Sequence, residues 1–282
     1  MSRIKIAAPA KINLTLEVLD KREDGFHNLK SIMQAISLYD YLTFDVTDSD
    51  KTQITLCGNS DKIPYDNKNL VYKAIEKFLE KTAINNKKIE VYIEKNIPVE
   101  AGLAGGSTDA AAAFFALNKL FNNPLSNEEI ELLCASLGSD LNFCLHGGTA
   151  LCTGRGEKTK KIPTKQQYVT LIKPLGFGIS AKEAYTKFAQ MSDKTVPDNT
   201  EKLMNDFSTN FLFNSLELAV INDYQELLEI KAAIPKALMS GSGPTFFVLE
   251  RYCPHVFDSK RFQVIEDLKF ITDGVKEIPH NC

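Results

Sequence analysis

The chain has 282 residues, of which 44% are hydrophobic and 24% charged, a balance typical of a globular protein with about two domains. Its formal net charge of −3 gives no electrostatic reason to expect nucleic acid or an anionic membrane as a partner. No apolar run approaches the roughly 20 residues that span a bilayer, and the N-terminus has no signal or transit pattern, so we expect a cytoplasmic protein.

Hydrophobic alternation dominates the first part of the chain. It predicts strands over residues 3–18, 30–38, 41–46 and 52–57, the first of them interrupted at Pro9, which lacks a ladder donor. Between the first two strands, residues 20–29 are polar and turn at Asp24-Gly25. Apolar residues then recur at helical spacing, which predicts an amphipathic helix over 69–81 with Asn69 near its cap.

Residues 98–118 read as a glycine-rich loop between a strand and a helix. The strand alternates through Ile89, Val91 and Ile93, and the helix is expected from Ala110 to Leu120. Glycines in such a loop let a ligand approach the backbone, and free N–H groups at the start of a helix attract anions, phosphate above all. The loop lacks the lysine of a Walker motif and the spacing of a dinucleotide fingerprint. A tight turn that feeds a buried helix fits the same residues.

The second half predicts further elements in order. We expect a helix over 127–137, a cap at Asp140 for a short helix, a strand over 148–153, and a polar, proline-bearing linker over 158–167. Beyond the linker we expect a strand over 168–173, helices over 181–190 and 214–230, a glycine hairpin over 240–249, a helix over 256–268 and a strand over 270–275. The linker divides the chain into domains 1–160 and 161–282.

Cysteines give little sign of disulfides or metal sites. No C-x-x-C pattern is present, so we expect reduced and mostly buried thiols. Cys144 and His146 are close in sequence but are too few for a zinc site, and we assign no metal ligands. The six cysteines are Cys57, Cys134, Cys144, Cys152, Cys253 and Cys282.

Several motifs, taken together, resemble the GHMP kinase superfamily. They are PAKINLTL at 9–16, DGFH at 24–27, NL at 69–70, PVEAGLAGGSTDAA at 98–111, LGSD at 137–140 and GSG at 241–243. The resemblance implies an α+β fold with an N-terminal domain like domain 2 of ribosomal protein S5, a ferredoxin-like C-terminal domain, and an active site between them. PAKINL joined to DGFH resembles the members that use ATP to phosphorylate the 2-hydroxyl of a cytidine-diphosphate-linked methylerythritol in the non-mevalonate isoprenoid pathway.

The resemblance also implies roles for individual residues. Lys11 and Asp140 match the catalytic lysine and aspartate, with Asp140 as proton acceptor and Lys11 stabilising the transferring phosphoryl group. Ser107 and Thr108 could offer hydroxyls to phosphate or Mg²⁺. The loop that matches the ATP-phosphate loop comprises Pro98, Val99, Glu100, Ala101, Gly102, Leu103, Ala104, Gly105, Gly106, Ser107 and Thr108.

Substrate contacts follow from the same resemblance. Asn69 and Lys95 match positions that line the adenosine pocket. Asn13, His27, Phe26 and Tyr185 are assigned to the cytidine substrate: His27 would read the edge of the cytosine while Phe26 and Tyr185 stack on its faces. The implied partner is thus a small molecule, and we expect a monomer or a weak homodimer.

The chain departs from the family pattern in three places. Glu100 and Ala104 stand where glycine is usual, and we infer that the Glu100 carboxylate points to solvent or pairs with a base, because it would repel a triphosphate. Asn142 replaces a usual proline. Two other functions stay open: a kinase for another small alcohol such as mevalonate or homoserine, and a silent nucleotide-binding module. The presence of both Lys11 and Asp140 argues against silence.

Overall fold

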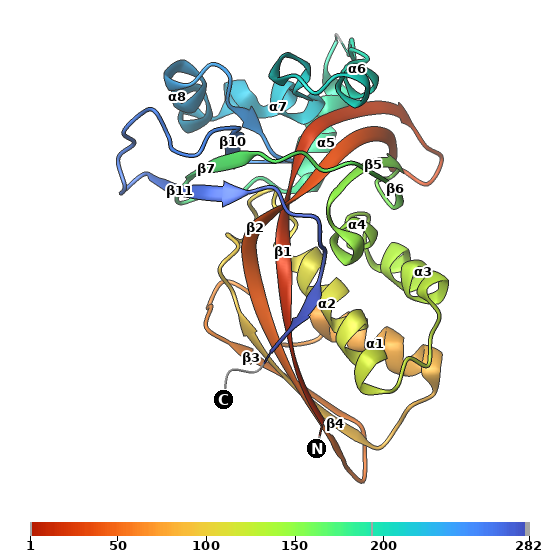
Figure 1. Ribbon diagram of the computed structural model, residues 1–282. Helices are drawn as coiled ribbons and strands as arrows, with labels where there is room; N and C mark the ends of the chain where they lie inside the picture. The colour runs from red at the N-terminus through yellow and green to blue at the C-terminus, as the bar shows by residue number, and fades with distance from the viewer. Residues whose placement is uncertain (1, 193, 280–282) are drawn as a thin grey trace.

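The computed structural model describes residues 2–192 and 194–279, which form two lobes (Figure 1). The strands are β1 (Ser2–Lys21), β2 (His27–Asp48), β3 (Gln53–Gly58), β4 (Lys87–Glu94), β5 (Thr149–Gly154), β6 (Lys158–Ile162), β7 (Tyr168–Pro174), β8 (Phe213–Asn214), β9 (Leu238–Met239), β10 (Phe246–Val248), β11 (Phe262–Lys269) and β12 (Lys276–Ile278). The α-helices are α1 (Leu70–Thr82), α2 (Gly105–Leu120), α3 (Asn127–Leu137), α4 (Leu141–His146), α5 (Ala181–Gln190), α6 (Asn199–Asn205), α7 (Ser215–Val220) and α8 (Gln225–Ala233), with short 3₁₀ turns at Thr209–Phe211 and Ile221–Asp223.

The larger sheet is built on two long strands. Its order is β12-β1-β2-β4-β3, with β5 paired to β2, β6 to β5 and β8 to β1. In Figure 1, β1 and β2 rise from the lower lobe into the upper one, so both lobes share them. The predicted interruption at Pro9 is a shift in register between Pro9 and Ala10 within one continuous strand. A bulge leaves the missing N–H of proline outside the regular ladder.

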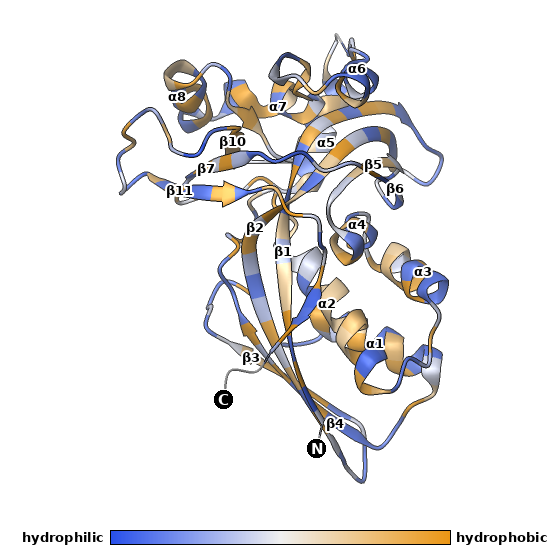
Figure 2. Ribbon diagram, viewed as in Figure 1, coloured by the Kyte–Doolittle hydropathy of each residue, from blue (hydrophilic) through white to orange (hydrophobic). Residues whose placement is uncertain are grey.

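Helices α1 to α4 cover one side of the larger sheet, where the main core lies (Figure 1). Phe44, Phe78 and Phe114 are fully buried there. The run Ala110–Ala113 of α2 is buried too, and its small side chains let the helix lie close to the strands beneath. Figure 2 shows apolar residues on these strands and helices interspersed with polar ones, the pattern of elements with one buried face.

The smaller sheet has the order β11-β7-β10-β9 with all pairs antiparallel. Numbered along the chain this is 4-1-3-2, the order of a ferredoxin-like sheet. Helices α5, α7 and α8 pack in the same lobe around a second core with Ile172, Leu227 and Phe246. The predicted α+β fold with two kinds of sheet is confirmed.

Several predicted elements were wrong. The expected linker begins with strand β6, and the expected helix over 214–230 is two helices, α7 and α8, separated by a 3₁₀ turn. Residues 256–268 contain a loop and all but the last residue of strand β11 rather than a helix, and the last strand is β12, not 270–275. Helix α6 was not predicted. The division into domains at residue 160 stays a prediction.

Candidate active site

Lys11 and Asp140 meet in the structure although 129 positions separate them. Lys11 lies on β1, and Asp140 is the residue before α4. The Lys11 Nζ atom is 3.6 Å from Asp140 Oδ2 and 2.6 Å from Asn13 Oδ1. The lysine side chain is 5% exposed and that of Asp140 29%. A buried ammonium is thus held by one carboxylate and one amide oxygen, while the carboxylate stays open to a substrate.

The glycine-rich loop runs beside this pair. The Leu103 carbonyl accepts the backbone N–H of Lys11 at 3.1 Å, which joins the loop to β1. On its other side the Gly102 carbonyl accepts the hydroxyl of Ser240 at 3.0 Å. Gly102 has a φ of +72°, and a Cβ there would lie 2.0 Å from the Ser240 carbonyl oxygen. Only glycine fits, because the loop touches the turn that connects β9 and β10.

A cavity of about 880 Å³ opens over the pair and the loop. From the loop, Gly102, Ala104 and Ser107 line it. Thr108 is fully buried, and its hydroxyl has no partner in the described structure. Of the two hydroxyls predicted at the end of the loop, that of Ser107 therefore reaches the cavity. Helix α2 begins at Gly105, five residues earlier than predicted, and its first N–H groups have no helical acceptor. This arrangement favours an anion at the loop.

Two departures from the family pattern have a visible consequence in the backbone. Glu100 and Ala104 adopt φ values of +50° and +58°, the left-handed region in which glycine costs least. The Glu100 side chain is exposed, as expected, and lies beside Gly178 of the upper lobe. Asn142, in α4, donates its amide to the Glu157 carbonyl at 3.0 Å and so joins α4 to the turn between β5 and β6.

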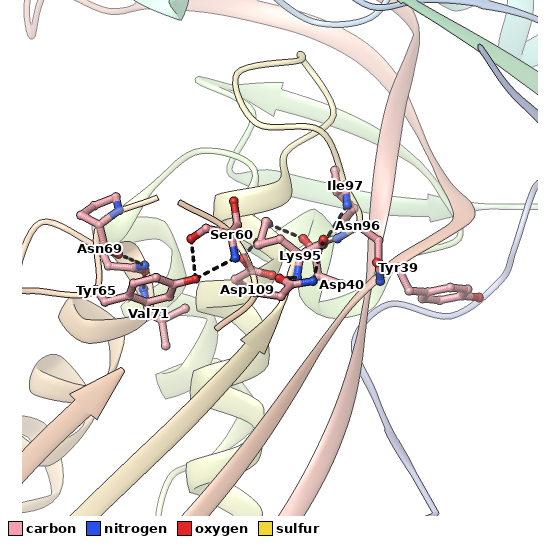
Figure 3. A network of polar contacts seen from close by, with 12 residues as sticks. Tyr39, Asp40, Ser60, Tyr65, Asn69, Val71, Lys95, Asn96, Ile97 and Asp109 are labelled. Atoms are coloured by element: carbon pink, nitrogen blue, oxygen red, sulfur yellow. Dashed lines mark hydrogen bonds and ion pairs between the residues drawn. The ribbon is translucent and has the colours of Figure 1, made fainter. Parts of the chain in front are cut away.

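Lys95 and Asn69 do not line the cavity. Figure 3 shows Lys95 between two carboxylates, those of Asp40 and Asp109. Asn69 caps α1: its side-chain oxygen accepts the N–H of Val71 at 2.9 Å, and its amide donates to Pro64 at 2.7 Å. Their assignment to an adenosine pocket stays a prediction.

Aromatic rings gather at the other end of the cavity. His27 stacks on Tyr185 with ring centroids 5.6 Å apart and an angle of 20° between the planes. Phe26 is half exposed, and the Arg155 guanidinium lies 4.8 Å from its ring centre. Burial and the nearby Lys21 and Lys194 lower the pKa of His27 below 6.5. The three predicted rings line the same cavity, and the His27 ring covers one face of Tyr185.

Sequence reasoning missed several lining residues, three of which are basic. Lys21, Arg155 and Lys182 line the cavity together with Lys11, against the single carboxylate of Asp140. Arg155 lies in the turn after β5. A charged residue between two glycines, Gly154 and Gly156, was the sequence feature that could have indicated a binding residue there. Gly241 lies in the GSG motif, and a Cβ on it would be 3.1 Å from Lys11 Nζ. The cavity suits a ligand with several phosphate charges.

The described residues show neither a ready-made metal site nor a membrane span. No group of three or more His, Cys, Asp or Glu side chains among them could hold a metal ion. None of their helices combines the length and apolar character needed to cross a bilayer. Of the five cysteines in that range, Cys134, Cys144 and Cys152 are buried, Cys253 is partly buried and Cys57 is exposed; Cys282 lies outside it.

Comparisons with known proteins agree with this geometry. Residues 69–148 match the model of the GHMP kinases N terminal domain, and the chain is a kinase of that superfamily. It is 41% identical over 256 residues to the 4-diphosphocytidyl-2-C-methyl-D-erythritol kinase of Clostridium tetani, across 86% of this chain and 90% of that protein. The chain belongs to the family of 4-diphosphocytidyl-2-C-methyl-D-erythritol kinases.

Two further relatives extend the match. The kinase of the same name from Bacillus pumilus is 39% identical over 286 residues, across 97% of this chain and 95% of that protein. A crystal structure of 4-(cytidine 5'-diphospho)-2C-methyl-D-erythritol kinase superposes with a TM-score of 0.74 and 30% identity, over 87% of this chain and 90% of that one. The similarity therefore includes both lobes.

Proposed function

We propose that this chain transfers the γ-phosphoryl group of ATP to the 2-hydroxyl of 4-diphosphocytidyl-2-C-methyl-D-erythritol, a step of the non-mevalonate isoprenoid pathway. The observation that carries the proposal is the approach of Lys11 to Asp140 within 3.6 Å, beside the loop and inside the cavity. Membership of the kinase family implies ATP as the phosphoryl donor. A cytoplasmic location and a monomeric or weakly dimeric state remain predictions.

The proposed reaction needs one proton acceptor and no covalent intermediate. The Asp140 carboxylate takes the proton of the attacking hydroxyl, the oxygen bonds to the γ-phosphorus, and the bond to ADP breaks. Lys11 lies where its ammonium can offset the negative charge of Asp140 and of the transferring group. Asn13 orients that ammonium through the contact of 2.6 Å. The phosphoryl group passes directly between the two oxygens.

Mg²⁺ fits this site as an ion that arrives with ATP. Magnesium is commonly bound by one or two protein oxygens together with substrate phosphates and waters. Ser107, whose hydroxyl reaches the cavity from the loop, would help to hold it there. When bound, Mg²⁺ neutralises phosphate charge and so favours the attack of an alkoxide-like oxygen.

The cytidine end of the substrate is proposed to occupy the aromatic end of the cavity. His27, Phe26 and Tyr185 offer ring faces and a polar edge to the base, while Arg155 offers charge to the diphosphate. Because His27 lies on Tyr185, we expect the imidazole to move when cytosine stacks there.

A panel of alcohols with ATP tests the proposal. The panel contains the cytidine-linked methylerythritol, mevalonate and homoserine, and ADP release is measured for each. We expect turnover with the first alone. Turnover with mevalonate or homoserine instead would assign the chain to another reaction on the same fold, and ATP binding without turnover on any of them would support a silent module.

A further inference from the structure

A buried network of charges lies behind the glycine-rich loop (Figure 3). Lys95 follows the last residue of β4, and its side chain is 5% exposed. The ammonium contacts Asp40 of β2 and lies 2.8 Å from Asp109 Oδ2 in α2. The side chains of both carboxylates are at most 4% exposed. One lysine therefore links two strands and a helix at a point closed to solvent.

The two carboxylates of the network differ in how many other hydrogen bonds they accept. Asp40 Oδ1 accepts the backbone N–H groups of Asn96 at 2.6 Å and Ile97 at 2.8 Å, so Asp40 is well supported without the lysine. Asp109 has no such support, because its Oδ1 atom is buried and without a partner. Lys95 is thus the group that compensates Asp109.

The ammonium also lies directly beneath the start of α2. A Cβ built on Gly105, the first residue of the helix, would be 3.1 Å from Lys95 Nζ. Asp109 is four residues further along, one turn into the helix. The N-terminus of α2 is therefore fixed to the sheet at the point where its N–H groups would meet phosphate.

We propose that Lys95 is a positioning residue, which holds the phosphate loop in place and offsets the carboxylates behind it, rather than a contact of adenosine. This inference rests on the proposed role of the loop in binding ATP phosphates. Without the lysine, the buried Asp40 carboxylate would lie behind a triphosphate with no cation to offset it, and Asp109 would lose its partner. Burial also raises the pKa of Asp109 to about 8, which keeps the network close to neutral at pH 7.

A residue that positions the phosphate loop and a residue that contacts adenosine affect the binding of different parts of ATP. A contact with adenosine contributes equally to the binding of ATP and of adenosine. A residue that positions the phosphate loop contributes to ATP alone. The test variant is Lys95→Met combined with Asp109→Asn, because methionine alone would strand the Asp109 carboxylate and endanger folding. Lys88→Met, on β4 itself and paired with Glu90 outside the core, is the matched control.

Binding is measured by displacement of a fluorescent ATP analogue, with no alcohol present. For the double variant we expect at least a tenfold loss of ATP affinity and an unchanged inhibition constant for adenosine; the control should match the unaltered protein. An equal loss for adenosine, or no loss for ATP, would overturn the inference. Failure of the unaltered protein to bind ATP would instead refute the proposed function.

A second measurement does not depend on the folding of the double variant. The charged groups that face Asp109 in the described structure are Lys95 and Asp40. Because burial raises the pKa of Asp109 to about 8, its ionisation at higher pH is expected to give the network a negative charge behind the loop. ATP affinity should therefore fall between pH 7 and pH 9 in the unaltered protein, and fall less in Asp109→Asn. Identical pH profiles for the two proteins would contradict the inference.

Discussion

Asp140→Asn removes the proposed proton acceptor while preserving the size of the side chain. The structure indicates that the surroundings survive this change. Lys11 keeps its contact of 2.6 Å with Asn13 Oδ1, so the ammonium retains an acceptor in the same place. Asp140 accepts no side-chain cap hydrogen bond from α4, so the helix does not depend on its charge. We therefore expect a folded protein with an altered reaction.

The expected loss of turnover is between about a hundredfold and ten-thousandfold, the usual contribution of a positioned general base. This range corresponds to about 3 to 5 kcal/mol of activation free energy. A charge pair at 3.6 Å attracts by about 4 to 5 kcal/mol at an effective dielectric constant of 20, a gross value that the partial exposure of Asp140 reduces. The two magnitudes overlap, so binding and turnover have to be measured separately.

Two assays separate binding from chemistry in this variant. ADP release with saturating substrates gives kcat, and displacement of a fluorescent ATP analogue gives the affinity for ATP. ATP should bind as tightly as before or more tightly, since a negative charge near the triphosphate is gone. Asp206→Asn changes an exposed aspartate and serves as the control. Unchanged turnover in Asp140→Asn would remove Asp140 from the mechanism.

Three further predictions concern His27 and Glu100. His27→Ala should raise KM for the cytidine substrate by about 10- to 100-fold, the cost of leaving the edge of the base without its hydrogen-bond partner, and leave KM for ATP alone; equal effects on both would place His27 in the ATP pocket. Since the pKa of His27 is below 6.5, acidification through that region should raise KM for the cytidine substrate and lower stability, because the unfolded chain binds the proton more readily; the KM effect should be absent in His27→Gln. Glu100→Gly should lower KM for ATP several-fold by removing a negative charge, whereas a higher KM would show that the carboxylate supports the loop.

Secondary structure was predicted most accurately from the sequence where the residues of one short segment determine its conformation. The alternation over 89–93 gave β4, and the helical spacing of apolar residues after Asn69 gave α1 with the expected cap. The helix expected over 127–137 is α3, and in the structure Ser126 starts it with a capping box. In each case the signal and the structure involve the same few residues, so no distant contact had to be known.

The wrong helix over 256–268 shows how a bulge can imitate helical spacing. Phe262, Ile265 and Leu268 recur every third residue, as on one face of a helix. In the structure they belong to β11, where the register with β7 shifts between Ile265 and Leu268. Asp267 has a φ of +59° at this bulge. The extra residue breaks the alternation of period two, and the pairing that reveals it lies about 90 residues upstream.

Long-range pairing also limited what could be predicted of the site. The motifs predicted roles for Lys11 and Asp140, which the structure brings within 3.6 Å of each other. The position of Lys95 depends on Asp40 and Asp109, which are 55 and 14 positions away. Secondary-structure propensity and hydrophobic periodicity do not predict such long-range contacts. The resemblance placed Lys95 near ATP, yet the side chain is buried among carboxylates, since the fold brings β2 and α2 together there.

The active site depends on both lobes through one strand. β1 carries Lys11 and Asn13, and it pairs with β2 in the first half of the chain and with β8 and β12 in the second. The loop is held in the same way, by Lys11 on one side and by Ser240 on the other. A shift of the upper lobe would therefore move the loop relative to Asp140, which α4 fixes to the lower lobe. Because phosphoryl transfer depends on alignment, we expect the contact between Ser240 and Gly102 to matter for the proposed catalytic geometry as the ion pair does.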